Sequence, residues 1–156
     1  MTSPNASDTL SFNTIVVGTD FQPCSQRAVN IAAGMVKASA QGQLFVVHTF
    51  EIPIYPGAEF YVVDMSTPIQ EAAQKQLDEC LRPLVERGVN ARGIIAMGPA
   101  SEQILKVAEQ TRADLIVVGT HGRRGLKHAV LGSVAEKVVR LSPVPVLTVH
   151  EAPSDV

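Results

Sequence analysis

The chain is poor in cysteine and in aromatic residues, and it has no long hydrophobic run. Two cysteines among 156 residues cannot form a disulfide framework, and neither lies in a Cys-x-x-Cys pair or a Cys/His cluster. Its apolar runs span only a few residues, whereas a membrane-spanning helix needs about 20. The first ten residues are polar and lack the basic start and apolar centre of a secretory signal. We therefore expect a cytoplasmic protein that does not insert into a membrane.

The chain also lacks a large net charge, because 13 basic residues nearly balance 15 acidic ones and leave only −2. The distribution of charge is uneven, however. Between residues 119 and 142 five basic residues stand against a single acidic one, so the rest of the chain is acidic. A basic segment in an acidic chain suits a small anionic ligand better than a long polyanion. We accordingly expect no nucleic-acid partner.

The length fits one domain, which we place at residues 13–150 between flexible tails at 1–12 and 151–156. Several short apolar runs are predicted as strands, at residues 14–18, 44–48, 91–97, 115–119 and 144–149. The first, second and fourth runs are continuously apolar and rich in β-branched residues. This pattern is typical of parallel strands that are buried on both faces.

Helical patterns alternate with these strands. They begin at Pro23, at a capping box formed by Thr67 and Gln70, near Pro99, and at Ser133. In the second helix, Pro83 is expected to kink or shorten the end. The alternation predicts an α/β fold, a doubly wound five-stranded parallel sheet with helices on both faces.

Two features lie outside this regular alternation. Pro145 cannot donate a ladder hydrogen bond, which predicts an edge position for the last strand. Residues 50–66 form one long irregular stretch that could be a flap over a ligand, a partner contact or a plain surface loop.

The segment after the fourth strand carries the clearest chemical pattern. Gly119, Gly122, Gly132 and Ser133 follow the spacing G-x2-G-x9-G-S. Glycines let the backbone approach an anion closely and adopt positive φ. The first N–H groups of the next helix, from Ser133 onward, favour negative charge. Because ligands of open α/β sheets bind beyond the carboxyl ends of the strands, this loop is predicted to bind phosphate.

The first strand delivers Thr19 and Asp20 to the same end of the sheet. The Asp20 carboxylate could accept from a ribose hydroxyl or hold Mg²⁺ on the phosphates. Alternatively, Asp20 only caps the helix that begins near Pro23. Ser133 likewise has an alternative role, since it forms a capping box with Glu136.

Two competing nucleotide motifs are absent. Residues 18–20 after the first strand do not supply the dinucleotide fingerprint G-x-G-x-x-G. Gly88 and Gly93 have the spacing of a P-loop, but Ile94 and Ile95 replace its required Lys-Ser/Thr pair.

Taken together, the motifs resemble those of the universal stress protein family. The similarity extends over most of residues 14–149. It rests on the order and spacing of short segments, at residues 15–21, 48, 113–122, 132–138 and 143–147. The resemblance implies a flavodoxin-like fold and homodimers paired through the last strand, with tetramers a further option. The intact glycine pattern is similar to that of the ATP-binding subgroup.

This resemblance also implies roles for individual residues. Phosphates would lie along the glycine loop and the start of the last helix, Asp20 near ribose, metal or adenine, and the backbone of Thr49 against adenine. The nucleotide-binding residues expected in this way are Thr19, Asp20, Thr49, Gly119, Thr120, His121, Gly122, Gly132, Ser133, Val134 and Ala135. Further basic residues of the loop are expected to neutralise phosphate charge, and these are Arg123, Arg124 and Lys127.

The leading functional hypothesis is a regulatory module that binds ATP with Mg²⁺ and whose assembly or contact with a protein partner depends on ATP. The alternative is an enzyme, a slow ATPase or phosphotransferase. Phosphoryl transfer needs a positioned acceptor and charge compensation, and the sequence has no second carboxylate that pairs with Asp20 in a recognisable motif. A third hypothesis is a ligand-free structural dimer, against which the intact glycine pattern argues.

Overall fold

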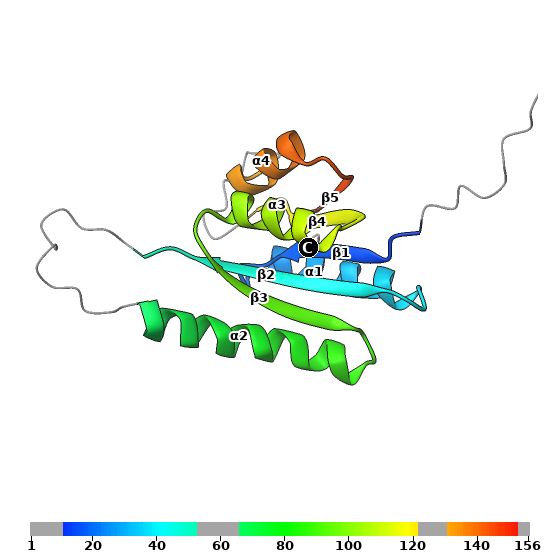
Figure 1. The fold of residues 1–156 in the computed structure, drawn as a ribbon, viewed down its shortest axis with the longest axis horizontal. Coiled ribbons are helices and arrows are strands. Elements are labelled where there is room, and N and C mark those ends of the chain that lie inside the picture. The colour runs from blue at the N-terminus through cyan, green and yellow to red at the C-terminus, as the bar shows by residue number, and fades with distance from the viewer. Residues whose placement is uncertain (1–10, 53–65, 122–130, 153–156) are drawn as a thin grey trace, which may run out of the picture.

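Five parallel strands form the centre of the molecule in the computed structural model, which describes residues 11–52, 66–121 and 131–152. The strand order is β3-β2-β1-β4-β5, so β1 is central and β3 and β5 form the edges (Figure 1). This confirms the doubly wound parallel sheet and the edge position of the last strand. The strands are β1 (Thr14–Gly18), β2 (Gln43–Phe50), β3 (Ala91–Met97), β4 (Leu115–Gly119) and β5 (Val146–Val149).

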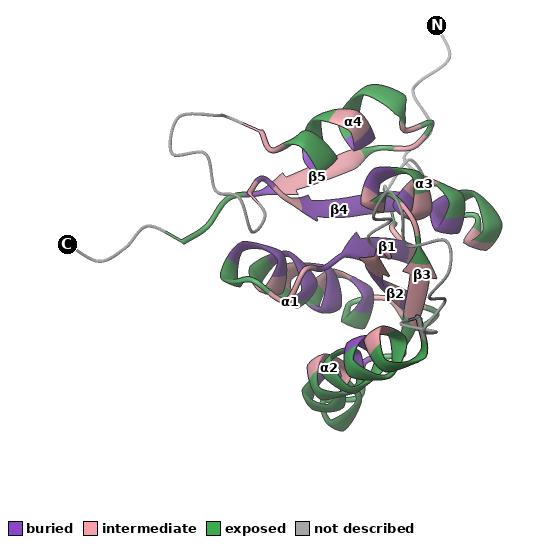
Figure 2. Ribbon diagram, turned by 90° about the vertical axis from the view of Figure 1, so that its left-hand side faces the viewer, coloured by how far each residue is buried: buried purple, intermediate pink, exposed green. Residues whose placement is uncertain are grey.

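The helices cover both faces of this sheet. Figure 2 shows α1 (Pro23–Lys37) and α2 (Ser66–Glu86) on one side, and α3 (Ala100–Thr111) and α4 (Ser133–Leu141) on the other. Each face has its own hydrophobic cluster, because successive side chains of a strand point to opposite faces. Ile15 and Val17 therefore pack against α1, whereas Val16 belongs to the cluster beneath α3 and α4.

The central strands are buried as their composition predicts. Ile15, Val16, Val17, Ile116 and Val117 are completely inaccessible to solvent. Burial of both faces stabilises β1 and β4 and holds their carboxyl ends in fixed positions beside each other (Figure 2). None of the helices in the described parts of the chain is long and apolar enough to cross a membrane.

Several predicted boundaries were wrong by one or two residues. The second strand runs on past His48 to Phe50, because Thr49 and Phe50 pair with the end of β3. The fifth strand begins at Val146 instead of 144, since its pairing with β4 begins there. The start of the third helix was predicted correctly near Pro99, because the helix begins at Ala100 with Pro99 as its N-cap residue.

The second helix differs more from expectation. It begins at Ser66, so Thr67 lies inside the helix and is not its N-cap residue. It continues through Pro83 to Glu86, because Pro83 is close to the C-terminus and the following Leu84 is completely buried. Gly88, in the left-handed conformation with φ of 81°, then ends the helical segment.

Parts of two predictions lie outside the described residues. Phe12 packs against the core beneath α1, but residues 1–10 and 153–156 of the expected tails are not described. The irregular stretch predicted at 50–66 is described only at its ends, because residues 53–65 are not.

Candidate functional site

The described residues enclose a cavity of about 1120 Å³ at the carboxyl ends of β1, β2 and β4. Its walls come from both faces of the sheet, because the first turns of α3 and α4 and the N-terminal half of α2 all reach it. Most of the residues predicted to bind nucleotide line this cavity, namely Thr19, Asp20, Thr49, Gly119, Thr120, His121, Gly132, Ser133, Val134 and Ala135. Four further predicted residues lie outside the described part of the chain, namely Gly122, Arg123, Arg124 and Lys127.

The Asp20 carboxylate sits in the turn between β1 and α1. Its Oδ1 accepts hydrogen bonds from the Ser25 hydroxyl at 2.6 Å and from the Gln22 N–H at 3.0 Å. The N-cap residue of α1 is Gln22, which has no side-chain capping bond, so Asp20 organises the entry to the helix without being its cap. Both bonds go to Oδ1. In the described residues no hydrogen bond involves Oδ2, so this oxygen of a cavity-lining residue is available to a ligand.

The turn that presents Asp20 is held in an unusual conformation. Phe21 has a φ of 63°, a left-handed value that is strained for an aromatic residue. Its N–H donates to Thr19 Oγ1 at 3.0 Å, and its ring lies 4.3 Å from the His48 ring. His48 in turn donates from Nδ1 to Thr19 O at 2.8 Å and is nearly completely buried. His48 therefore serves to fix this turn.

The end of β2 presents its backbone to the cavity. Backbone groups of a parallel strand alternate between its two neighbours. Val47 O accepts from Thr19 N–H on the β1 side, whereas Phe50 O accepts from Gly98 N–H on the β3 side. The N–H and C=O of Thr49 accordingly face the side of β1, beyond the point where β1 ends at Gly18.

The two described glycines of the loop are explained by close packing and not by positive φ, so the expectation of positive φ was wrong for both. A Cβ on Gly119 would lie 3.0 Å from Cys24 Sγ and 3.1 Å from Ser25 N, at the start of α1. A Cβ on Gly132 would lie 3.1 Å from Thr120 O. Gly132 has an extended backbone, and its N–H donates to Thr120 O at 2.6 Å, so the two ends of the intervening loop meet.

The first turn of α4 has N–H donors that no other part of the helix satisfies. Its N-cap residue is Gly132, which offers no side chain to cap it, and the first helical hydrogen bond runs from Glu136 N–H to Gly132 O. The N–H groups of Ser133, Val134 and Ala135 therefore have no partner within the helix. The predicted capping box was wrong, because Ser133 is the first helical residue and the Glu136 carboxylate pairs with Arg140.

Thr120 and His121, which follow β4, line the cavity next to the first turn of α4. Thr120 is completely buried, and its Oγ1 lies 2.7 Å from His121 Nδ1 and 3.3 Å from His150 Nδ1. Its N–H donates to Val149 O at 2.9 Å. The contact with Thr120 orients the His121 ring at the edge of the cavity.

Some residues of the lining were not predicted from the sequence. Ser25 follows Asp20 in the first turn of α1, Ser101 lies in the first turn of α3, and Lys137 lies one turn after Ser133 on the same side of α4. The i, i+4 spacing from Ser133 was the available signal for Lys137. Ile69 and Gln76 reach the cavity from α2, a placement that depends on how this helix lies on the sheet.

Protein side chains alone do not form a metal site here. Within residues 11–52, 66–121 and 131–152, no group of three His, Cys, Asp or Glu side chains is arranged to hold a metal ion. Mg²⁺ near Asp20 would therefore need oxygen ligands from a bound phosphate chain, which is how this ion is commonly held.

Comparison with known proteins agrees with this architecture. The model of the universal stress protein family matches residues 11–150. Universal stress protein YxiE of Bacillus subtilis (strain 168) is 31% identical over 148 residues, which covers 89% of this chain and 99% of that protein.

Solved structures extend the comparison to the fold. The structure of Methanocaldococcus jannaschii protein MJ0577 is similar with a TM-score of 0.82 and 27% identity, over 93% of this chain and all of that one. A universal stress protein solved in complex with cAMP is similar with a TM-score of 0.66 and 28% identity, over 91% and 99% of the two chains. This chain belongs to the universal stress protein family.

Proposed function

We propose that the chain binds ATP together with Mg²⁺ in the cavity at the carboxyl ends of β1, β2 and β4, as a regulatory stress-response module. One observation carries this proposal: Ser133, Val134 and Ala135, whose N–H groups have no partner among the described residues, line a cavity large enough for a nucleotide. The family relative solved with cAMP supports a nucleotide as the kind of ligand.

The proposed arrangement assigns one part of the nucleotide to each wall. The phosphates lie against the first turn of α4, where N–H groups and the helix dipole favour negative charge. Adenine meets the backbone of Thr49, whose N–H and C=O face the space beyond β1. Asp20 Oδ2 is available to a ribose hydroxyl or to Mg²⁺ on the phosphates. The basic residues Arg123, Arg124 and Lys127 add positive charge to the loop in this proposal.

We further propose that the chain forms a homodimer through the edge strand β5, with a tetramer as a possible larger assembly. The edge has unpaired backbone groups, and the adjoining α4 exposes Val139 and Leu141. In this proposal ATP binding is coupled to β5 through Thr120. This residue lines the cavity and donates its N–H to Val149 O, at the end of β5. Native mass measurements with and without ATP test this; identical assembly states in both would contradict regulation of assembly.

Nucleotide binding itself is tested on the purified protein. The protein is denatured and the supernatant is analysed for nucleotide, and refolded or nucleotide-stripped protein is titrated with ATP and Mg²⁺ by calorimetry. We expect ATP in the supernatant or one calorimetric binding event per chain. The absence of both would overturn the proposal.

A second candidate function is a slow ATPase or phosphotransferase. The observation that favours it is the 2.7 Å contact between Thr120 Oγ1 and His121 Nδ1, a hydroxyl and an imidazole at the cavity. Turnover beyond one equivalent of ATP that is lost in Asp20→Ala at unchanged affinity would support an enzyme. Binding without turnover would support the regulatory module.

A further inference from the structure

Two ion pairs lie on α4, and only one of them reaches the cavity. Lys137 Nζ is 3.0 Å from Glu102 Oε1, and Lys137 lines the cavity wall. Arg140 Nε is also 3.0 Å from Glu136 Oε1, but neither residue of this pair lines the cavity. The Lys137 side chain is 36% exposed, whereas that of Arg140 is 61% exposed. The two pairs therefore differ in what their cations can reach.

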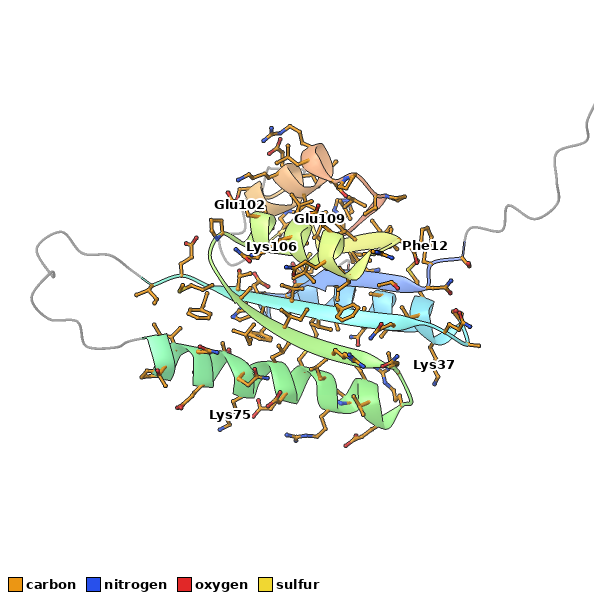
Figure 3. All side chains as sticks on the ribbon, viewed as in Figure 1. Phe12, Lys37, Lys75, Glu102, Lys106 and Glu109 are labelled. Atoms are coloured by element: carbon orange, nitrogen blue, oxygen red, sulfur yellow. The ribbon has the colours of Figure 1, made fainter. Side chains whose placement is uncertain are left out.

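Lys137 is placed to act at the start of its helix. Side chains of an α-helix lean toward the N-terminus, so Lys137 extends over the turn that begins at Ser133. Its partner Glu102 belongs to the first turn of α3, which lies beside α4 (Figures 1 and 3). Among the described residues that line the cavity, Lys137 is the only Lys or Arg.

We propose that Lys137 binds the terminal phosphates of the nucleotide, that Glu102 holds its ammonium group while the site is empty, and that affinity therefore rises with the number of phosphates. This inference rests on the proposed function, because it names the group that selects among nucleotides at the same site. It makes the Glu102–Lys137 pair a competitor of the ligand.

The exchange of partners is energetically favourable. A solvent-exposed ion pair changes an equilibrium by only roughly 1- to 5-fold, and Glu102 is 57% exposed. A charge-assisted hydrogen bond to a phosphate is worth roughly 10-fold or more. Glu102 stays hydrated after Lys137 has left it, so the loss of its partner costs little. The Lys137 ammonium group therefore binds the phosphate in preference to the Glu102 carboxylate.

A second hydrogen-bond donor, the Ser101 hydroxyl, belongs to the same part of the cavity wall. Ser101 precedes Glu102 in the first turn of α3, lines the cavity and is only 5% exposed. No hydrogen bond among the described residues involves its hydroxyl, and none of their buried side-chain oxygen or nitrogen atoms lacks a partner, so this hydroxyl is accessible from the cavity. An accessible hydroxyl at the cavity wall can hydrogen-bond to a polar ligand beside Lys137.

The test compares four ligands across matched variants of the full chain. Calorimetry with Mg²⁺ gives the affinities of adenosine, AMP, ADP and ATP for the wild type, Lys137→Met, Lys137→Arg and Glu102→Gln. Arg140→Met is the control, because it removes the cation of the other ion pair on the same helix. Circular dichroism and thermal unfolding establish that each variant is folded.

We expect Lys137→Met to weaken ATP binding about 10-fold, to weaken AMP binding less and to leave adenosine unchanged. Lys137→Arg should retain most of the preference for ATP. Glu102→Gln should strengthen ATP binding roughly 2- to 5-fold, because the ammonium group is no longer held. Arg140→Met should bind all four ligands as the wild type does.

Two results would overturn the inference in distinguishable ways. If the wild type prefers ATP and folded Lys137→Met keeps the same preference, the role of Lys137 is wrong while the proposed function stands. If the wild type binds neither ATP nor ADP, both the proposed function and this inference fail.

Discussion

Replacing Gly119 by alanine should disturb the contact between the end of β4 and the start of α1. The added Cβ would lie 3.0 Å from Cys24 Sγ, 3.1 Å from Ser25 N and 3.2 Å from Cys24 C. Two of these three atoms belong to the backbone of α1, so the helix has to move away by a few tenths of an ångström. Overpacking of this kind typically costs 1–3 kcal/mol, and we expect about 2 kcal/mol for Gly119→Ala.

The assay is thermal unfolding followed by circular dichroism. For a chain of this size about 2 kcal/mol corresponds to a Tm that is lower by roughly 4–8 °C. Gly34→Ala is the matched control, because Gly34 lies inside α1 and a Cβ there would meet no atom within 4 Å. This control should gain about 0.5–1 kcal/mol, since alanine favours the helix interior.

The two substitutions therefore have opposite expected signs. A Gly119→Ala variant that unfolds at the wild-type temperature, alongside a stabilised Gly34→Ala, would refute the packing explanation. The glycine would then have to be explained by its position next to a ligand, as the sequence pattern alone had indicated.

Three further predictions concern the loop, the start of β1 and a half-buried thiol. Gly122→Leu should abolish ATP binding while the circular dichroism spectrum stays that of the wild type, because a bulky side chain blocks the backbone approach; normal binding would show the loop assignment to be wrong. Asp114→Ala removes the Oδ2 that accepts the Asn13 and Thr14 N–H groups at 2.9 and 2.8 Å, and should cost about 1 kcal/mol in urea unfolding; an unchanged urea midpoint would contradict this. Burial raises the pKa of the Cys80 thiol, so the wild type should lose stability as the pH rises from the ordinary thiol pKa of about 8.5 through the raised value, and Cys80→Ala should lose less over the same range. Parallel stability curves for the two proteins over this range would refute the last prediction.

The central strands could be predicted residue for residue. Residues 14–18 and 115–119 are continuous apolar runs, and such runs predict strands that are buried on both faces. The length of β2 could not be predicted in this way. Thr49 and Phe50 are strand residues because they pair with Ala96 and Met97, and this pairing depends on the sheet and not on local sequence.

The candidate site likewise contains residues that local sequence predicts and residues that depend on tertiary packing. The glycine spacing and the order of strands predicted the side formed by β1, β4 and α4, because the chain itself places those residues at the carboxyl ends of strands. The contributions of α2 and α3, such as Gln76 and Ser101, depend on how the helices pack across the sheet. The close packing that requires a glycine at position 119 could not be predicted either, because it involves Cys24, which is far away in the chain.

The central claim is that ATP occupies the cavity with its phosphates at the start of α4. The most direct measurement is a titration of isotope-labelled, nucleotide-free protein with ATP and Mg²⁺, followed by amide chemical shifts. The account predicts saturable shifts of the Ser133, Val134, Ala135 and Thr49 amides, at one nucleotide per chain. Saturating ATP that leaves these four amides unmoved would contradict it, whether or not other amides respond.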